Sequence, residues 1–327
     1  MIILTGGAGM IGSMIAWHLN TILNKNQFVI VDELLVPEQE KNINKRDFID
    51  LIGKHELPNY LKKNSQIEAI IHMGAISATT ENNFNNLLKS NIRYSQFLWD
   101  WASANQVPLV YASSAATYGD GKFGYKDNSD SLLNYKPLNA YGYSKHFFDI
   151  WVQNQLQQNL PKPPKWFGLK FFNVYGPNEY HKGKMSSVVY HAFNQFKKDG
   201  EVRLFKSKNP KFKDGMQLRD FIYVKDAVRC IFHLLESSNK SGLYNIGTGQ
   251  AQSFKDLAKA LLINLEESES LIKYIDMPKE LENKYQYYTE ADINRLRNSG
   301  YDLKFNNLLE GVSDYAQNYL FKSDQYA

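Results

Sequence analysis

Short runs of apolar residues alternate with segments of helical periodicity through the first half of the chain. The runs predicted to form strands lie at residues 1–4, 28–31, 69–72, 109–111 and 166–172. Unbroken apolar runs of this length are typical of parallel strands that are covered on both faces. Residues 87–101 and 141–158 have their apolar positions at helical spacing. The alternation predicts an α/β fold, with a doubly wound parallel sheet, helices on both faces and right-handed crossovers.

The pattern changes at residues 173–177, after the last of these runs. The remainder is richer in loops and aromatic residues, and it predicts a smaller α/β lobe that lies over the first one. We therefore expect one domain over residues 1–175, with 219–248 packing back onto it, and a second domain over 176–327. Residues 120–139 are polar and irregular, and we expect them to form a surface loop without chemistry.

A glycine-rich turn, TGGAGMIGS at residues 5–13, stands between the first predicted strand and a helical run. Gly6 permits the tight turn, Gly9 lets the backbone approach a pyrophosphate, and Gly12 lets the helix pack closely on the strand. The amino end of the helix then faces the anion. The arrangement predicts a dinucleotide site, so the first domain is expected to be a Rossmann-type dinucleotide-binding domain and the second a substrate-binding lobe.

Two acidic residues, Asp32 and Glu33, follow the second predicted strand. A carboxylate about twenty residues beyond the glycine turn is placed to bind the adenosine ribose hydroxyls of a dinucleotide. The acid favours NAD, because it would repel the 2′-phosphate of NADP. The basic residues that follow could supply a positive charge for that phosphate, or they could simply belong to a solvated loop. They are Lys41, Lys45, Arg46 and Lys54. The residues by themselves leave the choice between NAD and NADP open.

A tyrosine and a lysine, Tyr141 and Lys145, stand four residues apart at the start of a predicted helix. Positions i and i+4 share one helix face, so we expect the Lys145 ammonium group to lower the pKa of the Tyr141 phenol. A phenolate near neutral pH can take a proton from a substrate hydroxyl. Ser114 follows an earlier strand, and its hydroxyl is expected to meet the tyrosine on one substrate oxygen. The combination predicts chemistry at a carbinol carbon.

Two other reactive residue types are interpreted as packing residues. His72 ends a predicted strand, and Cys230 is followed by a run of apolar residues at helical spacing. Because Cys230 is the single cysteine, the chain has no internal disulfide and no cysteine cluster for a metal ion. We expect no metal site.

Composition narrows the function classes further. The chain has 327 residues and a net charge of +4, which does not imply a broad nucleic-acid-binding surface. No apolar run approaches the ~20 residues that cross a membrane, and we see no signal peptide. Lysine and arginine stand among aromatic residues at 182–184, 205–208 and 219–224. They suit the phosphates of a nucleotide diphosphate, and surface charge explains them equally well.

Together these motifs resemble the extended short-chain dehydrogenase/reductase family, which includes nucleotide-sugar epimerases. The matching motifs are TGGAGMIG at 5–12, HMGA at 72–75, YASSAATYG at 111–119, YGYSK at 141–145, FFNVYGP at 171–177 and RDFIYV at 219–224. They cover most of the chain, in the order and spacing of the family. Further segments resemble the branch of this family that acts on ADP-heptose. These are SATTE at 77–81, PLNAYGYSK at 137–145, FNVYGPNEYHKGKMSSV at 172–188 and KYQYYTEADINRLRNSGYD at 284–302.

The resemblance implies an isomerase that inverts C-6″ of ADP-D-glycero-β-D-manno-heptose, giving ADP-L-glycero-β-D-manno-heptose for the lipopolysaccharide inner core. It would oxidise that carbon transiently to a ketone with one tightly bound cofactor per subunit, NADP or alternatively NAD. The resemblance also implies a cytoplasmic homo-oligomer, typically a pentamer, without nucleic-acid or membrane partners. The alternatives are another nucleotide-sugar epimerase or reductase of the family, or a non-catalytic dinucleotide-binding sensor.

The resemblance further implies roles for individual residues. Tyr141 matches the acid/base tyrosine, Lys145 its partner, Ser114 the hydroxyl that steadies the reacting oxygen, and Lys182 a second base. The implied cofactor contacts are Gly6, Gly9, Met10, Ile11, Gly12, Asp32, Glu33, Lys41, Lys54, Met73, Gly74, Ala75, Ile76, Ser77, Asn91, Lys145, Val174 and Lys182. The implied substrate contacts are Asn173, Lys184, His191, Phe205, Lys206, Ser207, Lys208, Arg219 and Tyr285. Met73 and Lys184 stand where the family usually has other residues.

Overall fold

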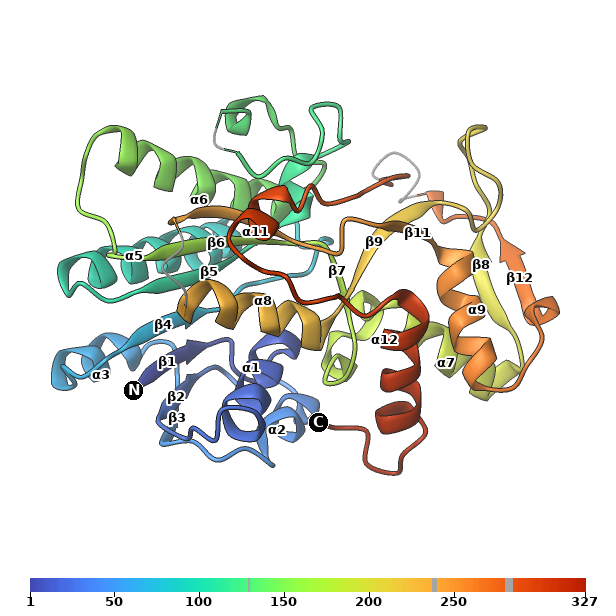
Figure 1. Ribbon diagram of the computed structural model, residues 1–327, viewed down its shortest axis with the longest axis horizontal. Helices are drawn as coiled ribbons and strands as arrows, with labels where there is room; N and C mark the ends of the chain where they lie inside the picture. Colours follow the sequence, from blue (N-terminus) through green and yellow to red (C-terminus); the bar gives the residue numbers. More distant parts are fainter. Residues whose placement is uncertain (129, 237–239, 280–284) are drawn as a thin grey trace.

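The chain folds into two lobes, and a seven-stranded parallel sheet forms the centre of the larger one (Figure 1). The computed structural model describes residues 1–128, 130–236, 240–279 and 285–327. The segments expected above at 120–139, 219–248 and 284–302 therefore include residues outside this description, namely 129, 237–239 and 284. The strand order is β10-β6-β5-β4-β1-β2-β3, and every neighbouring pair is parallel. This order confirms the predicted doubly wound α/β fold.

The strands of the large sheet include all five predicted runs. They are β1 (Ile2–Thr5), β2 (Phe28–Val31), β3 (Asp50–Ile52), β4 (Ala69–His72), β5 (Leu109–Ser114), β6 (Trp166–Phe171) and β10 (Gly242–Ile246). Strand β3 was not predicted, because it has three residues at the sheet edge and only Ile52 is buried. Strand β10 closes the opposite edge by pairing with β6.

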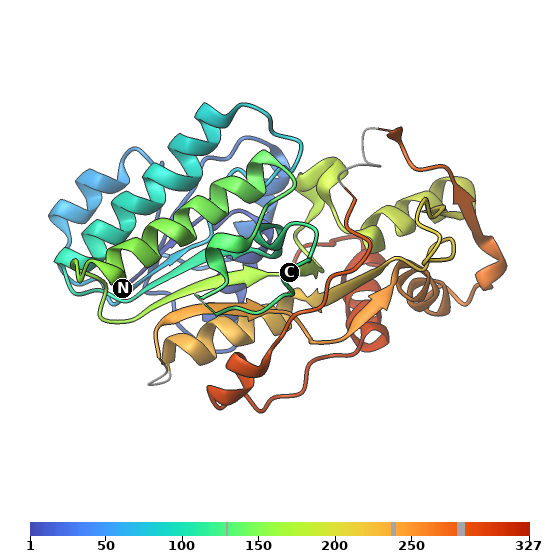
Figure 2. The same ribbon diagram turned by 90° about the horizontal axis from the view of Figure 1, so that it is seen from above.

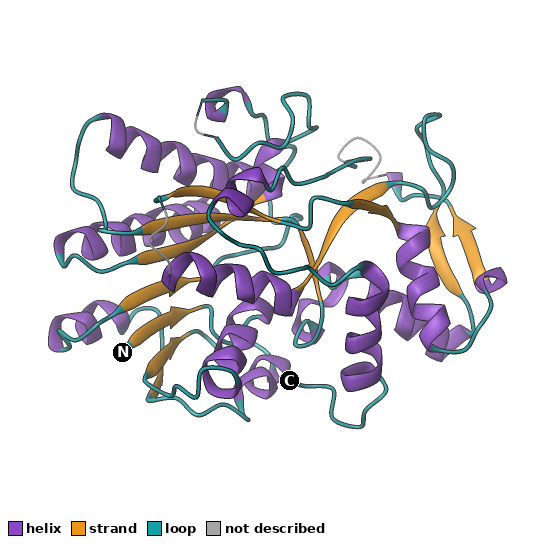
Figure 3. Ribbon diagram, viewed as in Figure 1, coloured by secondary structure: helices purple, strands orange, loops and turns teal. Residues whose placement is uncertain are grey.

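Helices cover both faces of this sheet (Figure 2). On one face lie α3 (Leu57–Lys63), α5 (Tyr94–Ala104) and α6 (Ala140–Gln157). On the other, α1 (Met10–Thr21) packs against α8 (Val224–Glu236) and α2 (Pro37–Ile43). A π-helical turn over Leu88–Arg93 connects α4 (Phe84–Leu87) to α5. The carboxyl ends of the strands point toward the smaller lobe (Figure 3), so this lobe lies beside the edge where parallel sheets bind ligands.

The smaller lobe consists of two short sheets and the helices around them. One sheet has β7 (Asn173–Tyr175), β9 (Leu218–Tyr223) and β11 (Ala251–Ser253), and the other has β8 (Val202–Phe205) and β12 (Ile272–Ile275). Helix α9 (Phe254–Asn264) packs against α7 (Val188–Asp199) and α12 (Leu308–Tyr315). Short helix α11 (Asn294–Asn298) lies beside β10. Within 219–248, strand β9 joins this lobe, whereas α8 and β10 pack on the large sheet.

The segment at 120–139 is more than the plain surface loop that we expected. Tyr125 and Tyr135 are buried, and both rings pack edge-on against Tyr118. Asp127 is also buried, and its carboxylate accepts a hydrogen bond from the backbone N–H of Asn245 at 2.8 Å. The expectation was wrong here, because a few aromatic residues within a polar segment are enough to anchor it on the core.

His72 and Cys230 are packing residues, as interpreted from the sequence. The ring nitrogens of His72 lie 2.6 Å from Thr5 Oγ1 and 2.9 Å from Ser95 Oγ. Burial lowers the pKa of His72 to about 3, so the ring is neutral. Cys230 is fully buried in α8, and burial raises the pKa of its thiol to about 12. None of the helices that the structure describes is long and apolar enough to span a membrane.

Candidate active site

A cleft of about 410 Å³ opens at the carboxyl ends of the strands. Most of the residues expected to bind a cofactor or to catalyse line it, because the turns after parallel strands meet at one edge. These lining residues are Gly6, Gly9, Met10, Ile11, Gly12, Asp32, Met73, Gly74, Ala75, Ser77, Ser114, Tyr141, Val174 and Lys182. The cleft therefore brings together motifs that are far apart in the sequence.

Several lining residues were missed by the sequence reasoning. They are Gln39, Ala112, Ser113, Phe171, Phe172, His181 and Met185. All except Gln39 lie within the motifs already recognised, so membership of a motif was the available signal. Gln39 lies in α2, which was not predicted as a helix.

The glycine turn leaves no room for side chains. Gly6 has a φ of +68°, and a methyl group there would lie 2.4 Å from the backbone nitrogen of Gly74. A methyl group at Gly12 would lie 2.0 Å from the carbonyl oxygen of Gly6. Gly9 begins α1 without a side-chain cap. The first N–H groups of α1 are therefore directed to the cleft without a competing side-chain acceptor, which suits an anion.

Asp32 lies at the end of β2, beside the glycine turn. Its carboxylate accepts hydrogen bonds from the backbone N–H groups of Ala8 and Glu33, each at 2.8 Å. Burial raises the pKa of Asp32, and these two hydrogen bonds oppose the rise. Glu33 points elsewhere and pairs with Lys54 at 3.5 Å and His55 at 3.4 Å. Lys54 thus lies near the end of β2, although it is outside the cleft lining.

The other basic residues of this region contact the last residues of the chain. Lys45 donates to the carbonyl oxygen of Tyr326 at 2.8 Å, and Arg46 donates to that of Ala327 at 3.1 Å. The Lys41 ammonium lies 5.9 Å from the centre of the Tyr326 ring. The described contacts of Lys45 and Arg46 therefore hold the end of the chain against the larger lobe.

Tyr141 and Ser114 line the cleft together, from α6 and from the end of β5. Burial raises the pKa of the Tyr141 phenol, and a hydrogen bond with the Ser114 hydroxyl opposes the rise. Lys145 is buried on the same helix, and its amine donates to the carbonyl oxygen of Ala112 at 2.8 Å. The expected lowering of the Tyr141 pKa by Lys145 is not found. The Ser114 hydroxyl is the group whose hydrogen bond lowers the pKa of this phenol.

Asn91 reaches the site indirectly. Its side chain accepts from the backbone N–H of Ile76 at 2.9 Å and donates to the carbonyl oxygen of Ile76 at 3.0 Å. It also donates to Ser144 Oγ at 2.9 Å. Asn91 and Ile76 are both outside the cleft lining. The hydrogen bonds of Asn91 fix the turn after β4 to helix α6. The π-helical turn that contains Asn91 is a feature often found at functional sites.

Lys182 enters the cleft from a 3₁₀ turn over Tyr180–Met185. Its amine lies 3.7 Å from the sulfur of Met10, in the glycine turn. His181 lines the cleft beside it, and burial together with the charge of Lys182 lowers the pKa of His181 to about 4. Asn42 holds this turn to the larger lobe, because its amide donates to the carbonyl oxygens of Ala8 and Asn178.

The expected substrate residues of the smaller lobe form a second group. Arg219 is 6% exposed, and its guanidinium stacks on Phe254 at 5.5 Å and on Tyr285 at 5.1 Å. Burial lowers the pKa of Arg219, and the neighbouring tyrosines oppose this. The backbone N–H of Lys208 donates to the hydroxyl of Tyr287 at 3.2 Å. Residues 205–208 therefore lie beside the segment that holds Tyr285.

Asp220, which was not singled out from the sequence, supports this second group. It is fully buried and accepts hydrogen bonds from the backbone N–H groups of Thr248, Gly249 and Ala291 at 2.7–3.0 Å. The Thr248 hydroxyl donates to it as well, at 2.7 Å. One buried carboxylate thus fixes β9, and Arg219 on it, to two distant segments.

The remaining expected substrate residues lie outside the cleft lining. On α7, the Nε2 atom of His191 lies 3.3 Å from the carbonyl oxygen of Lys184. The Lys184 side chain is exposed. Asn173 is exposed on β7, next to the lining residue Val174. Lys206 pairs with Asp276 at 3.3 Å. The structure thus brings Lys184 to His191 and Arg219 to Tyr285, but it does not place all these residues in one pocket.

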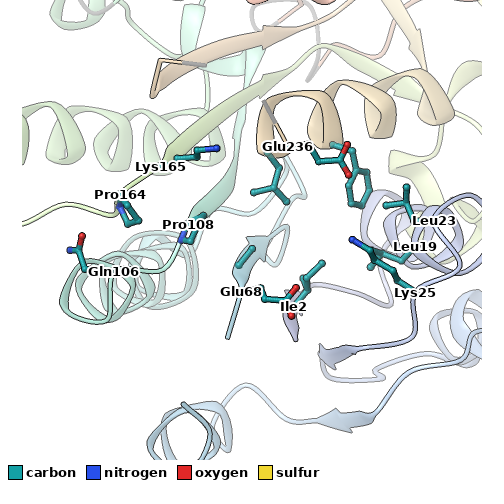
Figure 4. Close-up of a pocket in the computed structure, with 13 residues that line it drawn as sticks. Ile2, Leu19, Leu23, Lys25, Glu68, Gln106, Pro108, Pro164, Lys165 and Glu236 are labelled. Carbon is teal, nitrogen blue, oxygen red and sulfur yellow. The ribbon is translucent and has the colours of Figure 1, made fainter. Parts of the chain in front are cut away.

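A second cavity, of about 340 Å³, lies at the amino ends of the strands (Figure 4). Ile2, Ala69 and Pro108 line it, next to the starts of β1, β4 and β5. The acidic lining residues Glu68 and Glu236 are exposed to solvent. This end of a parallel sheet is not where doubly wound folds bind ligands, so the first cleft is the candidate site.

Comparisons with known proteins agree with this geometry. The NAD dependent epimerase/dehydratase family matches residues 2–247. ADP-L-glycero-D-manno-heptose-6-epimerases of Fusobacterium nucleatum and Nitratidesulfovibrio vulgaris are 51% and 42% identical, each over 100% of both chains. The crystal structure of the Helicobacter pylori enzyme of that name superposes with a TM-score of 0.82 at 28% identity, covering 97% of this chain and 95% of that chain. A UDP-N-acetylglucosamine 4-epimerase from Methanobrevibacter ruminantium shares the fold, with a TM-score of 0.78 at 21% identity over 97% and 96% of the two chains. The chain therefore belongs to the NAD dependent epimerase/dehydratase family, in the group whose curated members are ADP-L-glycero-D-manno-heptose-6-epimerases.

Proposed function

We propose that this protein inverts C-6″ of ADP-D-glycero-β-D-manno-heptose to give ADP-L-glycero-β-D-manno-heptose, in lipopolysaccharide inner-core biosynthesis. The observation that supports this most directly is the meeting of Ser114, Tyr141 and Lys182 in one cleft with the glycine turn. The full-length similarity to enzymes named for this reaction supports the choice of sugar.

The residues of the cleft suit a nicotinamide dinucleotide. The bare glycine turn and the uncapped amino end of α1 would hold its pyrophosphate, and Asp32 would bind the adenosine ribose. The wall formed by Met73, Gly74 and Ala75 would contact the nicotinamide end. When bound, the cofactor supplies the reversible oxidation of C-6″ to a ketone.

The chain's own residues would supply the proton transfers. Tyr141 would take or return the proton of the C-6″ hydroxyl, while Ser114 holds that oxygen by a hydrogen bond. Lys145 would keep the helix in place through Ala112 and add positive charge near the reacting oxygen. Lys182 would act as the second acid/base group. Two such groups are needed because the two epimers direct their oxygens differently.

We propose NADP as the resident cofactor, with NAD as the alternative. Lys54 and His55 lie close to Glu33 beyond the end of β2, so basic side chains stand beside the proposed adenosine site. Lys41 lies on α2, the helix that follows β2, where it contacts the Tyr326 ring. Asp32 supports the alternative, because its carboxylate would repel a 2′-phosphate. Release of the cofactor from the purified protein and assay with NAD- and NADP-specific dehydrogenases would decide between them.

We propose that the second group of residues binds the ADP part of the substrate. Arg219 supports this role, because its buried guanidinium is stacked on aromatic rings and has no carboxylate partner among the described residues. An arginine in this state suits a pyrophosphate. Lys184, His191 and Asn173 would contact the heptose.

A 4,6-dehydratase with the same fold is disfavoured. Dehydration needs an acid beside the active-site hydroxyl, and Ala115 follows Ser114. Within the described lining of the cleft, Asp32 is the single carboxylate, and it lies at the adenosine end. A non-catalytic sensor would not need Tyr141 and Lys182 in one cleft.

The proposal also includes a cytoplasmic homo-oligomer, a pentamer by family resemblance. An exposed aromatic cluster of Phe84, Tyr143 and Phe147 on α4 and α6 is a candidate contact surface. Sedimentation velocity of the purified protein would give the number of subunits.

The deciding experiment is incubation of the purified protein with ADP-D-glycero-β-D-manno-heptose and no added cofactor, followed by NMR of the sugar. We expect the L-glycero epimer to form, which would show both the reaction and a retained cofactor. If no epimer forms even after NAD or NADP is added, while UDP- or GDP-sugars are converted, the substrate assignment is wrong.

A further inference from the structure

A buried ion pair lies behind the proposed catalytic residues. Lys170 Nζ on β6 is 2.7 Å from Asp149 Oδ2 on α6, and the two side chains are 1% and 0% exposed. Asp149 follows Lys145 by one helical turn and Tyr141 by two, so the three residues share one face of α6. Neither member of the pair lines the cleft. The pair is therefore beside the active site without access to a ligand.

Stability alone does not explain two charges in this position. Removing both charges from water costs free energy that their attraction only partly returns, and apolar residues of similar volume often replace such pairs without loss. Most other described ion pairs of this protein are partly exposed, such as Lys225 with Asp314. The ion pair of Asp149 and Lys170 is thus better explained by the arrangement of helix and sheet that it fixes.

The hydrogen bonds of the pair lead to both halves of the site. On one side, Lys170 Nζ donates to Thr117 Oγ1 at 2.7 Å, and the Thr117 hydroxyl donates to the carbonyl oxygen of Ser114 at 2.8 Å. On the other side, Asp149 accepts from Ser113 Oγ at 2.7 Å and from the Tyr111 hydroxyl at 3.2 Å, both on β5. The network connects α6 to the end of β5 at the level of Ser114.

We propose that Asp149 and Lys170 are positioning residues of this active site. The ion pair fixes α6 against the end of β5, so that Tyr141 on the helix and Ser114 on the strand end meet at one substrate oxygen. The inference rests on the proposed function only in taking Ser114 and Tyr141 as the groups that face the reacting carbon. Neither residue lines the cleft, so neither is placed to touch substrate or cofactor.

Asp149 also has an electrostatic effect on Lys145. Burial lowers the pKa of Lys145 to about 8, and the Asp149 carboxylate opposes this. Other ionisable groups of these surroundings are His72 on β4, whose pKa the charge of Lys145 lowers, and Tyr111 on β5 and Lys170 on β6, which both contact Asp149. Tyr141 lies one turn before Lys145 on α6. Asp149 is the group whose charge supports the ammonium form of Lys145.

The test compares kcat, KM and thermal midpoint for four variants of the holoenzyme, D149N, K170M, the double variant D149N/K170M and K170R. Each single neutral variant leaves one buried charge unpaired, so both stability and kcat are expected to fall. The double variant removes both charges of the ion pair and is expected to regain part of the stability. Its kcat is expected to stay about 10- to 100-fold below that of the wild type, with KM within about twofold, since misplacement by ~1 Å costs rates of that order.

Two further measurements separate positioning from folding. K170R keeps the charge and the donors, so its kcat is expected to stay within about threefold of the wild type. In D149N, the pH above which kcat falls is expected to move downward, because Lys145 loses its supporting carboxylate. As a matched control, D226N neutralises another fully buried carboxylate, which is bonded to Arg229 and Asn306 on the far side of the sheet. It is expected to lower stability without changing kcat or its pH profile.

A double variant with wild-type kcat and a wild-type pH profile would overturn the proposal. If the wild type does not convert ADP-heptose, the substrate assignment is wrong. The positioning role is then tested by comparing crystal structures of the wild type and the double variant. A shift of ~1 Å between the Ser114 and Tyr141 hydroxyls is expected, and unchanged positions would also overturn the proposal.

Discussion

At Tyr141, burial and hydrogen bonding change the pKa of the phenol in opposite directions. Burial disfavours the phenolate, and the Ser114 hydroxyl stabilises it. Lys145 is one turn away, yet its amine is directed to the carbonyl oxygen of Ala112. The spacing of a tyrosine and a lysine therefore does not by itself say how the two side chains interact. The hydroxyl at the end of β5 is the partner that the local geometry provides.

Replacing Tyr141 by phenylalanine tests its role as the acid/base group. We expect Y141F to lower the rate of epimerisation by ~10²–10⁴-fold, because the proton transfer loses its donor and acceptor. The rate is measured by NMR of the C-6″ centre. Y143F is the matched control, since Tyr143 is 37% exposed on the same helix and lies outside the cleft lining. Full activity of Y141F would rule out the assignment.

Among the elements, the π-helical turn over Leu88–Arg93 has the most specific link to the site. Its Asn91 binds both backbone polar groups of Ile76 and the hydroxyl of Ser144, so one amide connects the turn after β4 to α6. Asn91 is 1% exposed, and no water can replace these hydrogen bonds easily. A helix of uniform α geometry was expected here, because the apolar spacing of 87–101 shows no interruption.

Replacing Asn91 by alanine is expected to lower the free energy of unfolding by about 1–3 kcal/mol, because it leaves buried partners without hydrogen bonds. We also expect the purified variant to retain less cofactor, since the turn over 73–77 loses its anchor. Chemical denaturation and absorbance of the released cofactor measure the two effects. N85A changes an exposed asparagine on α4 and is expected to match the wild type. Equal stability of N91A and N85A would contradict this account.

Over the whole molecule, full or partial burial keeps several histidines neutral. Burial is the main reason that the pKa is lowered to about 3 at His72 and to about 4 at His146 and His181. The unfolded chain binds protons at these rings below pH ~6.5, whereas the folded chain excludes them down to about pH 4. Stability is therefore present above that window and is lost as the pH falls through it. Asp127 has the opposite effect on the pH dependence of stability, because burial raises its pKa to about 6.

Replacing His146 by asparagine tests this linkage. We expect H146N to reduce the slope of unfolding free energy against pH by up to about 1.4 kcal/mol per pH unit between pH 4 and 6.5, because one proton fewer is taken up on unfolding. Denaturant unfolding at a series of pH values measures the slope. N91A serves as a second reference, because it lowers stability without removing a titratable group. A slope equal to that of the wild type would show that His146 does not titrate on unfolding.

The sequence by itself determined the five inner strands of the large sheet and the glycine turn, because both depend on local patterns. Apolar runs such as 28–31 and 69–72 form strands wherever they are covered, and Gly6 and Gly12 occupy positions that no other residue fits. Only the tertiary structure decided which polar groups meet. It directed Lys145 to Ala112, joined Lys170 to Asp149 and fixed Asp220 between two segments. These partners are separated along the chain, and burial selects them because each enclosed charge or donor must find a partner.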